Sequence, residues 1–301
     1  MCNTLLGCAI SDALGVFAEG KLSTYRPLLD WDGKTFLGSE RHGLKPGEYS
    51  DDTAFSITLA ESLINNNGFN PDDISKKYVD LVLSGRSRGF GRTTYAAIQN
   101  LQSGIHWSES GIPGSYGNGS AMRASPIGIF FRNDIKSLVE SATIDAQITH
   151  ASNEAIAGSI AIALAAAFAS NNDLENLTKR ICEYLPDSKV KSKIYGLESL
   201  INADHIAPQQ ALSVLGTGAD VKETVPSSIY CFLKFDNFTD AIITAIKAGK
   251  DADTTAAITG SLIASNLGIN GIDSIYYTVE DFDKLTILDS QLFNRNNHKY
   301  F

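Results

Sequence analysis

The residues best suited to chemistry in this sequence form two short acidic motifs. One reads SDDT at positions 50–53, and the other reads DADT at positions 251–254. Each precedes a strongly apolar stretch that is typical of a buried helix, so one interpretation is that they only cap helix starts and complement the helix dipole. A cap uses one oxygen, whereas each motif offers at least three oxygen-bearing side chains. This surplus indicates a further role.

A metal site is the role that these oxygens favour, provided that the two motifs meet in the folded chain. Four carboxylates gathered in a partly buried place repel one another and must be protonated or neutralised by cations. The oxygens are hard ligands with no Cys or His nearby in the sequence, which selects Mg²⁺, Mn²⁺ or Ca²⁺ over zinc or copper. About 200 residues separate the motifs, so their convergence is an assumption.

A glycine-rich segment, SYGNGSAMR at 115–123, is the best candidate for binding a phosphate. Gly117 and Gly119 let the backbone approach a ligand closely, and a helix that follows would present free N–H groups to an anion. The alternative is a plain glycine-rich turn in which Asn118 or Ser120 caps the helix.

Two further features are ambiguous on the residues alone. His150 ends a predicted helix, and a lone histidine is more often structural or exposed than a ligand. The segment Gly216-Thr217-Gly218 precedes a predicted helix that contains Tyr230. A simple connection explains this segment as well as a substrate-lining loop does.

The elements that must position these motifs are helices. Apolar residues recur at helical spacing through nearly the whole chain, and strand patterns are scarce. Gly, Pro and Asn concentrate in predicted loops at 20–50, 104–119, 215–226 and 268–272, and the first loop is long enough to suggest a function. We therefore predict an all-α fold with helices at 3–18, 52–66, 72–84, 92–103, 119–131, 135–148, 152–170, 173–185, 190–203, 208–214, 223–235, 238–248, 253–267 and 280–291. Helix starts are expected at Pro71-Asp72-Asp73, at Asn172-Asp173 and between Asp236 and Asp240.

Bulk composition bounds the class of protein. The chain has 301 residues, of which 43% are hydrophobic and 20% charged, and its net charge is −9. No repeat and no linker-like shift in composition divides it, so we expect one compact domain over residues 1–301. An acidic balance does not favour general nucleic-acid binding, which needs a basic face.

The cysteines and the apolar segments favour a cytoplasmic protein. The four cysteines contain no CxxC pair, so we expect no zinc site and predict reduced thiols. The N-terminus lacks the basic leader and the apolar core of a signal peptide. The Ala-rich segment 155–169 is too short to span a bilayer comfortably, and we interpret it as a buried central helix. No association with a membrane is expected.

The chain resembles the ADP-ribosylglycohydrolase family in an ordered set of motifs, namely CAISDALGVFAEG, SDDT, GNGSAMR, TH and DADTTAAITGSLIASNLGING. This family includes the dinitrogenase reductase-activating glycohydrolases and the ADP-ribosyl-acceptor hydrolases. The resemblance extends from about Gly7 to Gly271 and so covers almost the whole chain. It implies a compact orthogonal bundle of helices with two Mg²⁺ or Mn²⁺ ions in a central cleft.

The resemblance also implies roles for individual residues. The implied metal ligands are Ser50, Asp51, Asp52, Asp251, Asp253 and Thr254. The implied substrate-binding residues are Gly117, Asn118, Gly119, Ser120, Met122, His150, Gly216 and Gly218, with Tyr230 as a further match for the adenosine end. Glu19 matches a glutamate that lies near the metals.

The implied reaction is metal-dependent hydrolysis of the glycosidic bond that links ADP-ribose to an acceptor. The partner would be an ADP-ribosylated protein or another ADP-ribosylated acceptor. The metals would hold the ribose hydroxyls and orient water, and a carboxylate would act as base or stabilise an oxocarbenium-like transition state. Asp52 and Asp251 are the first candidates for that catalytic carboxylate, and Glu19 is the third.

Three positions depart from the family pattern. Ser11 replaces the first Gly of the usual GDALG motif, and Lys250 stands where the second of two glycines usually precedes the second acidic motif. Gly89 lies in a segment where many relatives have Asp. The change at Gly89 puts in doubt any recognition of the acceptor by that residue, notably of arginine-linked substrates. Lys250 would either contact a phosphate or an acceptor, or point to solvent.

Three other functions stay open on the sequence. One is a hydrolase of a different ADP-ribose derivative, the second is a non-catalytic relative that binds ADP-ribose or serves structurally, and the third is a metal-dependent phosphohydrolase. The intact acidic motifs argue against a non-catalytic relative. The sequence does not select among Arg, Ser, nucleic-acid and small-molecule acceptors.

Overall fold

The chain folds into helices, which confirms the predicted all-α class. The computed structural model describes residues 2–86, 88–203 and 205–295, and this part contains isolated β-bridges but no strand. Its helices are α1 (Thr4–Gly15), η1 (Val16–Ala18), α2 (Arg26–Asp30), α3 (Asp51–Asn66), α4 (Pro71–Leu83), α5 (Arg92–Gln102), α6 (Trp107–Ser110), α7 (Ser125–Phe130), α8 (Ile135–Thr149), α9 (Asn153–Ser170), α10 (Leu177–Tyr184), α11 (Lys189–Tyr195), α12 (Leu197–Ile201), α13 (Pro208–Leu215), α14 (Val221–Lys234), α15 (Phe238–Lys247), α16 (Ala252–Leu267), η2 (Ile269–Gly271), η3 (Ser274–Tyr276) and α17 (Phe282–Asn294).

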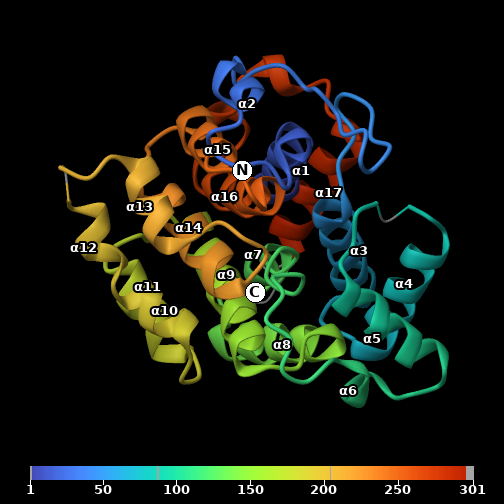
Figure 1. The fold of residues 1–301 in the computed structure, drawn as a ribbon. Coiled ribbons are helices and arrows are strands. Elements are labelled where there is room, and N and C mark those ends of the chain that lie inside the picture. Colours follow the sequence, from blue (N-terminus) through green and yellow to red (C-terminus); the bar gives the residue numbers. More distant parts are fainter. Residues whose placement is uncertain (1, 87, 204, 296–301) are drawn as a thin grey trace.

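The helices α1 and α16 pack tightly against each other in the interior, where small residues bring their backbones together (Figure 1). A Cβ atom on Gly7 would lie 2.3 Å from the carbonyl oxygen of Gly260, so the close approach requires glycine. Ser11 is fully buried over Gly260. At the end of α1, a Cβ atom on Gly15 would lie 2.6 Å from the Cα atom of Asp253. The end of α1 therefore rests against the start of α16, which carries the second acidic motif.

The Ala-rich segment forms α9, which is buried as predicted. This helix is 18 residues long with a mean hydropathy of 1.4, enough by length and composition to cross a bilayer, but 78% of it is buried in the fold. It packs against α7, α8, α14 and α16. Because neighbouring helices cover its apolar surface, we interpret α9 as a core helix.

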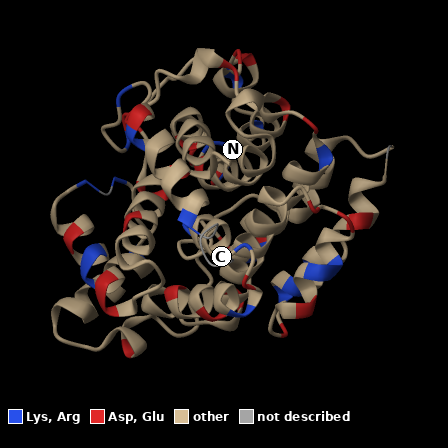
Figure 2. Ribbon diagram, turned by 180° about the vertical axis from the view of Figure 1, so that it is seen from behind, with Lys and Arg blue, Asp and Glu red and all other residues tan. Residues whose placement is uncertain are grey.

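The other helices surround this core. α10 to α13 lie on one side and α4 to α6 on the other, while α17 packs against α1 and α3 (Figure 1). Figure 2 shows Lys and Arg interspersed with Asp and Glu around the outer helices. The outer layer therefore carries charge of both signs, whereas the interior contains a concentration of acids.

Two of the three predicted helix starts are confirmed. Asn70 and Asn237 accept hydrogen bonds from first-turn N–H groups of α4 and α15, respectively. The start predicted at 172–173 is wrong, because α10 begins only at Leu177. Asn172 and Asn176 have left-handed φ angles of 54° and 50°, a conformation that interrupts a right-handed helix.

Two other predicted helices are too long. The segment 119–123 forms turns, and α7 begins at Ser125, because Pro126 favours the first turn and has no N–H for a longer helix. The helix predicted at 190–203 is divided at Gly196 into α11 and α12. Conversely, α2 and α6 lie in predicted loops. Helices of four or five residues contain too little periodicity to be recognised in a sequence.

Asp289 on α17 fixes the first turn of α1. Its two carboxylate oxygens accept hydrogen bonds from the backbone N–H groups of Leu5 at 2.9 Å and Leu6 at 3.1 Å. Burial raises the pKa of Asp289 from 3.8 to about 7, although both hydrogen bonds favour the charged form. The folded protein therefore keeps a proton on Asp289 at pH values where the unfolded chain has lost it.

This difference predicts a pH-dependent contribution to stability. Between the unfolded and folded pKa values, the contribution of Asp289 falls as the pH rises, by at most about 1.4 kcal/mol per pH unit. Asp289→Asn cannot ionise and offers one acceptor oxygen, so we expect it to be less stable than wild type at pH 4.5 and to approach wild type towards pH 7.5. Urea unfolding followed by circular dichroism measures the difference, and a gap that stays constant with pH would contradict this account.

Candidate functional site

The two acidic motifs meet at the starts of α3 and α16, which supports the assumption made from the sequence. Thr254 Oγ1 donates a hydrogen bond to Asp52 Oδ1 at 3.2 Å, a direct contact between the motifs. Residues from both motifs line one cleft of about 270 Å³, namely Asp51, Asp52, Asp251, Asp253 and Thr254. Ser50 lies beside them and accepts a hydrogen bond from the backbone of Asp52 at 3.2 Å, so this predicted ligand also caps α3.

Burial and mutual repulsion raise the pKa values of these carboxyl groups. Burial is the largest cause for Asp51, Asp52 and Asp253, whose pKa values lie well above the ordinary range, and neighbouring aspartates raise them further. Burial also raises the pKa of Asp251 to about 6, although Asn118 donates a hydrogen bond to it. Carboxylates in such a place are stable only when protons or cations neutralise them.

Asp12 is a buried acid beside the cleft that sequence analysis missed. Its carboxylate accepts hydrogen bonds from the backbone N–H groups of Ser50 and Thr53 and from Thr53 Oγ1, the last at 2.6 Å. Burial nevertheless raises the pKa of Asp12 to about 6. Asp12 therefore fixes the start of α3. An aspartate in the middle of the apolar helix α1 was the signal that could have revealed it, since such residues are rarely buried without a partner.

The donor set fits a hard divalent cation. Asp253 Oδ1 is buried and has no hydrogen-bond partner in the described part of the chain. The other donors are carboxylate and hydroxyl oxygens, which are the ligands that Mg²⁺ and Mn²⁺ prefer. Among the described residues, however, no three acidic, histidine or cysteine side chains are already arranged around one point as a ligand set. The oxygen donors are thus gathered in one place without being arranged as a ligand set, and both cation binding and the number of ions stay predictions.

The predicted glycine loop lines the same cleft. The residues that it contributes, together with the histidine that follows α8, are Gly117, Asn118, Gly119, Met122 and His150. A Cβ atom on Gly119 would lie 2.7 Å from His150 Cε1, so glycine is needed where the loop meets the ring. The amide of Asn118 donates to Asp251 and, at 2.9 Å, to Thr224 Oγ1. Asn118 therefore joins the loop to the second acidic motif instead of capping a helix.

His150 is buried beside this loop in its neutral form. Burial lowers its pKa to about 3, and the charge of Arg123 adds to this effect. Arg123 Nη2 donates to Thr149 Oγ1 at 2.9 Å, and Thr149 Oγ1 forms a hydrogen bond with His150 Nδ1 at 2.8 Å. His150 Nε2 lies on the side of Gly117 and Gly119. In the neutral tautomer that carries its proton on Nε2, the ring can donate to a phosphate oxygen.

Arg123 was not assigned a role from the sequence, yet it organises this side of the cleft. It is fully buried, and its Nε donates to Asp145 Oδ2 at 2.9 Å. Tyr78 donates to the other oxygen of Asp145 at 2.7 Å, and its ring lies 4.6 Å from the guanidinium. Arg123 Nη1 also donates to the carbonyl oxygen of Gly119 at 2.9 Å. The last residue of GNGSAMR thus holds the loop that precedes it.

Four predicted substrate residues lie outside the cleft. Ser120 is buried and donates to the carbonyl oxygen of Ala155 at 3.3 Å. Gly216 and Gly218 are covered by Glu223, which accepts a hydrogen bond from Gly218 N at 2.8 Å. Tyr230 is fully buried in α14. The neighbouring loop residue that does line the cleft is Ala219.

Gly89 and Lys250, two of the three positions that depart from the family pattern, lie in different cavities. Gly89 lines the cleft with a φ of 101°, and a Cβ atom there would lie 3.3 Å from Asp51 Oδ1. An aspartate at this position would therefore be strained and would repel Asp51. Lys250 lines a different cavity behind the second motif, and its Nζ lies 3.9 Å from Glu223. The described geometry gives Lys250 no place in the cleft.

Glu19 lines the cleft, as expected for a residue near the metals, but it has partners of its own. His42 contacts its Oε2, and Arg41 lies 3.3 Å from its Oε1. Both partners come from the long segment between α2 and α3. This segment therefore supplies the partners of Glu19, and its predicted functional importance stays a prediction.

Acids, a glycine loop and a buried histidine thus surround one cleft in an all-α fold. The profile of the ADP-ribosylglycohydrolase family matches residues 1–300. The chain therefore belongs to the ADP-ribosylglycohydrolase family, a family of hydrolases, and the resemblance inferred from its motifs is confirmed.

Individual relatives agree with this assignment. The ADP-ribosylhydrolase ARH3 of Mus musculus is 27% identical over 283 residues, which cover 81% of this chain and 76% of ARH3. The ADP-ribosylarginine hydrolase Tri1 of Pseudomonas putida (strain GB-1) is 26% identical over 279 residues, which cover 90% of this chain and 71% of Tri1. A solved structure of an ADP-ribosylglycohydrolase-related protein complex shares the fold, with a TM-score of 0.75 at 23% identity over 97% of this chain and 96% of that one.

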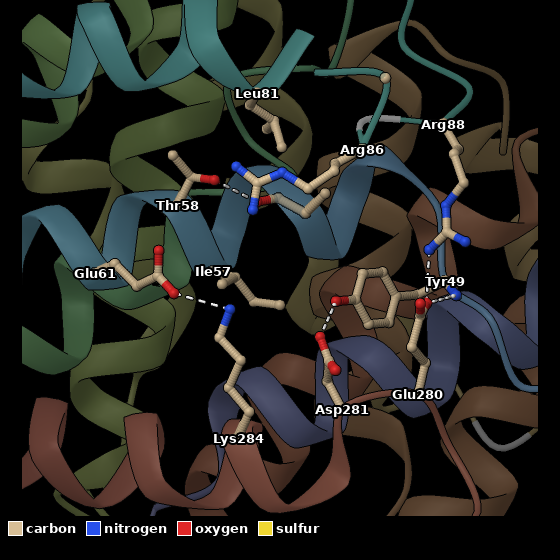
Figure 3. A pocket seen from close by; sticks show the side chains of 12 residues that line it. Tyr49, Ile57, Thr58, Glu61, Leu81, Arg86, Arg88, Glu280, Asp281 and Lys284 are labelled. Atoms are coloured by element: carbon tan, nitrogen blue, oxygen red, sulfur yellow. Dashed lines mark hydrogen bonds and ion pairs between the residues drawn. The ribbon is translucent and has the colours of Figure 1, made fainter. Parts of the chain in front are cut away.

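An ionic clamp holds the first acidic motif from behind the cleft. Arg88 Nη2 lies 2.6 Å from Glu280, Nη1 lies 3.3 Å from Glu48, and the guanidinium stacks over the ring of Tyr49 (Figure 3). The carbonyl oxygen of Arg88 accepts a hydrogen bond from Asp51 N at 2.8 Å. The clamp therefore connects the start of α17 to the backbone of Asp51. Tyr49, Arg88 and Glu280 line a cavity of about 310 Å³ (Figure 3).

The clamp predicts a remote effect on cation binding. Glu280→Gln removes the charge that holds Arg88, so we expect Asp51 to be less well positioned and Mn²⁺ to bind about five- to tenfold more weakly, a loss on the order of 1 kcal/mol. Glu61→Gln is the matched control, because Glu61 lines the same cavity but pairs with Lys284 at 2.9 Å (Figure 3). Calorimetric titration with Mn²⁺ measures both variants. Equal affinities in wild type and Glu280→Gln would show that the clamp does not position Asp51.

Proposed function

We propose that this protein hydrolyses the glycosidic bond that links ADP-ribose to an acceptor, with two Mg²⁺ or Mn²⁺ ions as cofactors. The observation that carries the proposal is the meeting of both acidic motifs with the glycine loop and His150 in one cleft. Membership of the family, and relatives named as an ADP-ribosylhydrolase and an ADP-ribosylarginine hydrolase, support it.

The residues that would hold the ions are those of the two motifs, namely Ser50, Asp51, Asp52, Asp251, Asp253 and Thr254. When bound, such ions neutralise the carboxylates and supply Lewis acidity for oxygen ligands. Bound cations would also keep the carboxylates ionised near neutral pH, because they oppose the effect of burial on the pKa values of these groups.

The protein itself supplies a base and an ordered binding surface. Asp52 and Asp251 are the candidates for the general base, and each is fixed by a hydrogen bond, from Thr254 and from Asn118, respectively. A base held in this way can take a proton from water without first reorganising. Glu19 is less suited to this role because Arg41 and His42 already engage its carboxylate.

The other end of the cleft would bind the diphosphate. Gly117 and Gly119 permit close approach of the backbone, and His150 presents Nε2–H as a donor. The substrate would thus lie with its distal ribose at the acids and its diphosphate at the loop. This orientation places the anomeric carbon of the distal ribose near the candidate bases.

The acceptor is not fixed by these features. The name of Tri1 specifies arginine, whereas the name of ARH3 specifies no acceptor. The sequence of this chain is nearly as similar to one as to the other. Gly89 contributes no carboxylate where an arginine-linked acceptor would benefit from one. ADP-ribosylated protein or another ADP-ribosylated acceptor is therefore proposed as the partner class.

The proposal predicts loss of activity in two variants that keep the fold. Asp251→Asn and Asp52→Asn are expected to lower the release of ADP-ribose at least a hundredfold, since each removes a candidate base and a cation ligand. Asp283→Asn is the control, because Asp283 lies in the first turn of α17 and is exposed. Chromatography of products from Arg-, Ser- and nucleic-acid-linked ADP-ribose, with Mg²⁺ or Mn²⁺ and again with chelator, measures the release.

The same assay separates the alternatives. Release of AMP in place of ADP-ribose would support a phosphohydrolase, and binding of ADP-ribose without any release would support a non-catalytic relative. Near-native turnover by Asp52→Asn or Asp251→Asn would refute the catalytic role of that residue. Activity that is unchanged by chelator would refute the metal dependence.

A further inference from the structure

A second cavity lies beside the turn that leads into α16, where α2, α13 and the end of α15 come together (Figure 1). Its volume is about 360 Å³, a size typical of small-molecule sites, which span roughly 300–1,000 Å³. Hydroxyl, amide and aliphatic side chains line it. Among the described residues that line it, Lys247 and Lys250 are the only ionisable ones. The cavity is therefore positively charged, in contrast to the acidic cleft.

Neither lysine has a strong acidic partner. Lys247 Nζ donates to the carbonyl oxygen of Leu29 at 3.4 Å, and no acidic side chain in the described ranges pairs with it. Lys250 Nζ lies 3.9 Å from Glu223, whose carboxylate already accepts a hydrogen bond from Gly218 N, and the Lys250 side chain is 53% exposed. A long and exposed ion pair of this kind contributes little. Most of the positive charge at the cavity is thus available to an anion.

The backbone at Lys250 points to a function for its side chain. Lys247 suits the last turn of α15, where a positive charge complements the helix dipole, but Lys250 has no such local reason. Its φ angle is 60°, in the left-handed region that favours glycine. It also directly precedes Asp251, the N-cap of α16, where the dipole disfavours a cation. A lysine kept at a strained position is a sign of function.

Thr217 supplies an independent sign of a ligand. It lies between Gly216 and Gly218, in the loop predicted to line the substrate site, but it lines this cavity and not the cleft. Its side chain is only 3% exposed, yet its hydroxyl group has no hydrogen-bond partner in the described part of the chain. Buried hydroxyl groups are normally satisfied, so a bound partner is expected at this point.

Backbone hydrogen bonds hold these groups in place. Lys250 N donates to the carbonyl oxygen of Lys21 at 2.5 Å, and Gly20 N donates to the carbonyl oxygen of Lys250 at 2.6 Å. The carbonyl oxygen of Thr217 accepts a hydrogen bond from Asp251 N at 2.9 Å. The cavity therefore presents its donors from a fixed backbone, which lowers the cost of ordering them when a ligand binds.

We infer that this cavity is a second anion site, separate from the cleft, that binds the phosphate group of a small molecule through Lys247, Lys250 and the Thr217 hydroxyl. Ammonium groups form charge-assisted hydrogen bonds with phosphate oxygens. A phosphate dianion balances both lysines, whereas a single carboxylate would balance only one. Free phosphate and a phosphate monoester share this chemistry, and the aliphatic side chains of Leu29 and Leu212 would contact the carbon atoms of an ester.

Calorimetric titration of the full chain with inorganic phosphate and with glycerol 3-phosphate, without added divalent cation, tests this inference. We expect Lys247→Gln and Lys250→Gln each to weaken the binding of both ligands about fivefold or more, because each removes one of the two charges. Thr217→Val should weaken binding as well, through loss of the hydroxyl donor. A higher affinity for either ligand identifies the source of the phosphate and supports the site.

The titration is repeated with ADP-ribose at saturation, to occupy the cleft. The affinity for phosphate should stay the same, because the cavity and the cleft share no lining residue in the described part of the chain. Loss of phosphate binding in the presence of ADP-ribose would overturn the inference, since the phosphate would then have bound in the cleft. A protein that binds phosphate through these lysines but does not bind ADP-ribose would support this site and refute the proposed function.

Lys34→Gln is the matched control, because Lys34 is exposed in the segment after α2 and does not line the cavity. It removes the same charge from the protein and should leave phosphate binding unchanged. Thermal unfolding establishes that each variant is folded. Equal affinities in wild type, Lys247→Gln and Lys250→Gln would overturn the inference, as would an equal loss in Lys34→Gln or the absence of phosphate binding to wild type.

Discussion

Carboxylates from α1, α3 and α16 share one buried region, and their repulsion is the constraint on which the rest of the arrangement depends. The charge of Asp12 raises the pKa values of Asp51, Asp52 and Asp253, in addition to the larger effect of burial. The positive ends of α3 and α16 reduce this cost but do not remove it, since the pKa values remain raised. The chain tolerates the cluster because rigid packing prevents the acids from moving apart. Close contact of α1 with α16, for which Gly15 is needed beside Asp253, fixes the backbones that carry them.

The side of the cleft that is formed by the glycine loop and His150 depends on a buried ion pair. Arg123 is paired with Asp145 and also holds the carbonyl oxygen of Gly119 and the hydroxyl of Thr149. Removing one partner of a fully buried ion pair typically costs about 3–5 kcal/mol, so this network has little freedom to rearrange. It therefore holds the backbone of the glycine loop and the position of Thr149, which contacts His150. Preorganised donors of this kind favour an anion without first having to be ordered.

The sequence was sufficient to predict the class of fold and the two halves of the site, because acidic motifs and a glycine loop are local signals. It was not sufficient for features that depend on tertiary contacts. Asp12 is a single polar residue within a helical pattern, and only the packing of α1 against α3 shows that it faces Ser50 and Thr53. Gly216 was predicted to line the substrate site, and only the folded chain shows that Glu223, seven positions later, lies against it. The late start of the helix predicted at 119–131 had a local signal in Pro126, which the apolar pattern around it outweighed.

The separation of charge within the cleft has a consequence for selectivity. A ligand that carries negative charge along its whole length would be repelled by the acids, and a purely neutral ligand would make no use of the glycine loop and His150. A molecule with hydroxyl groups at one end and phosphates at the other satisfies both regions at once. Buried or partly buried polar groups that lose their partner disfavour binding more than an additional contact favours it. If the proposed function is right, the arrangement of Glu19, Asp251 and His150 in one cleft would therefore select by the order of chemical groups in the ligand as well as by their identity.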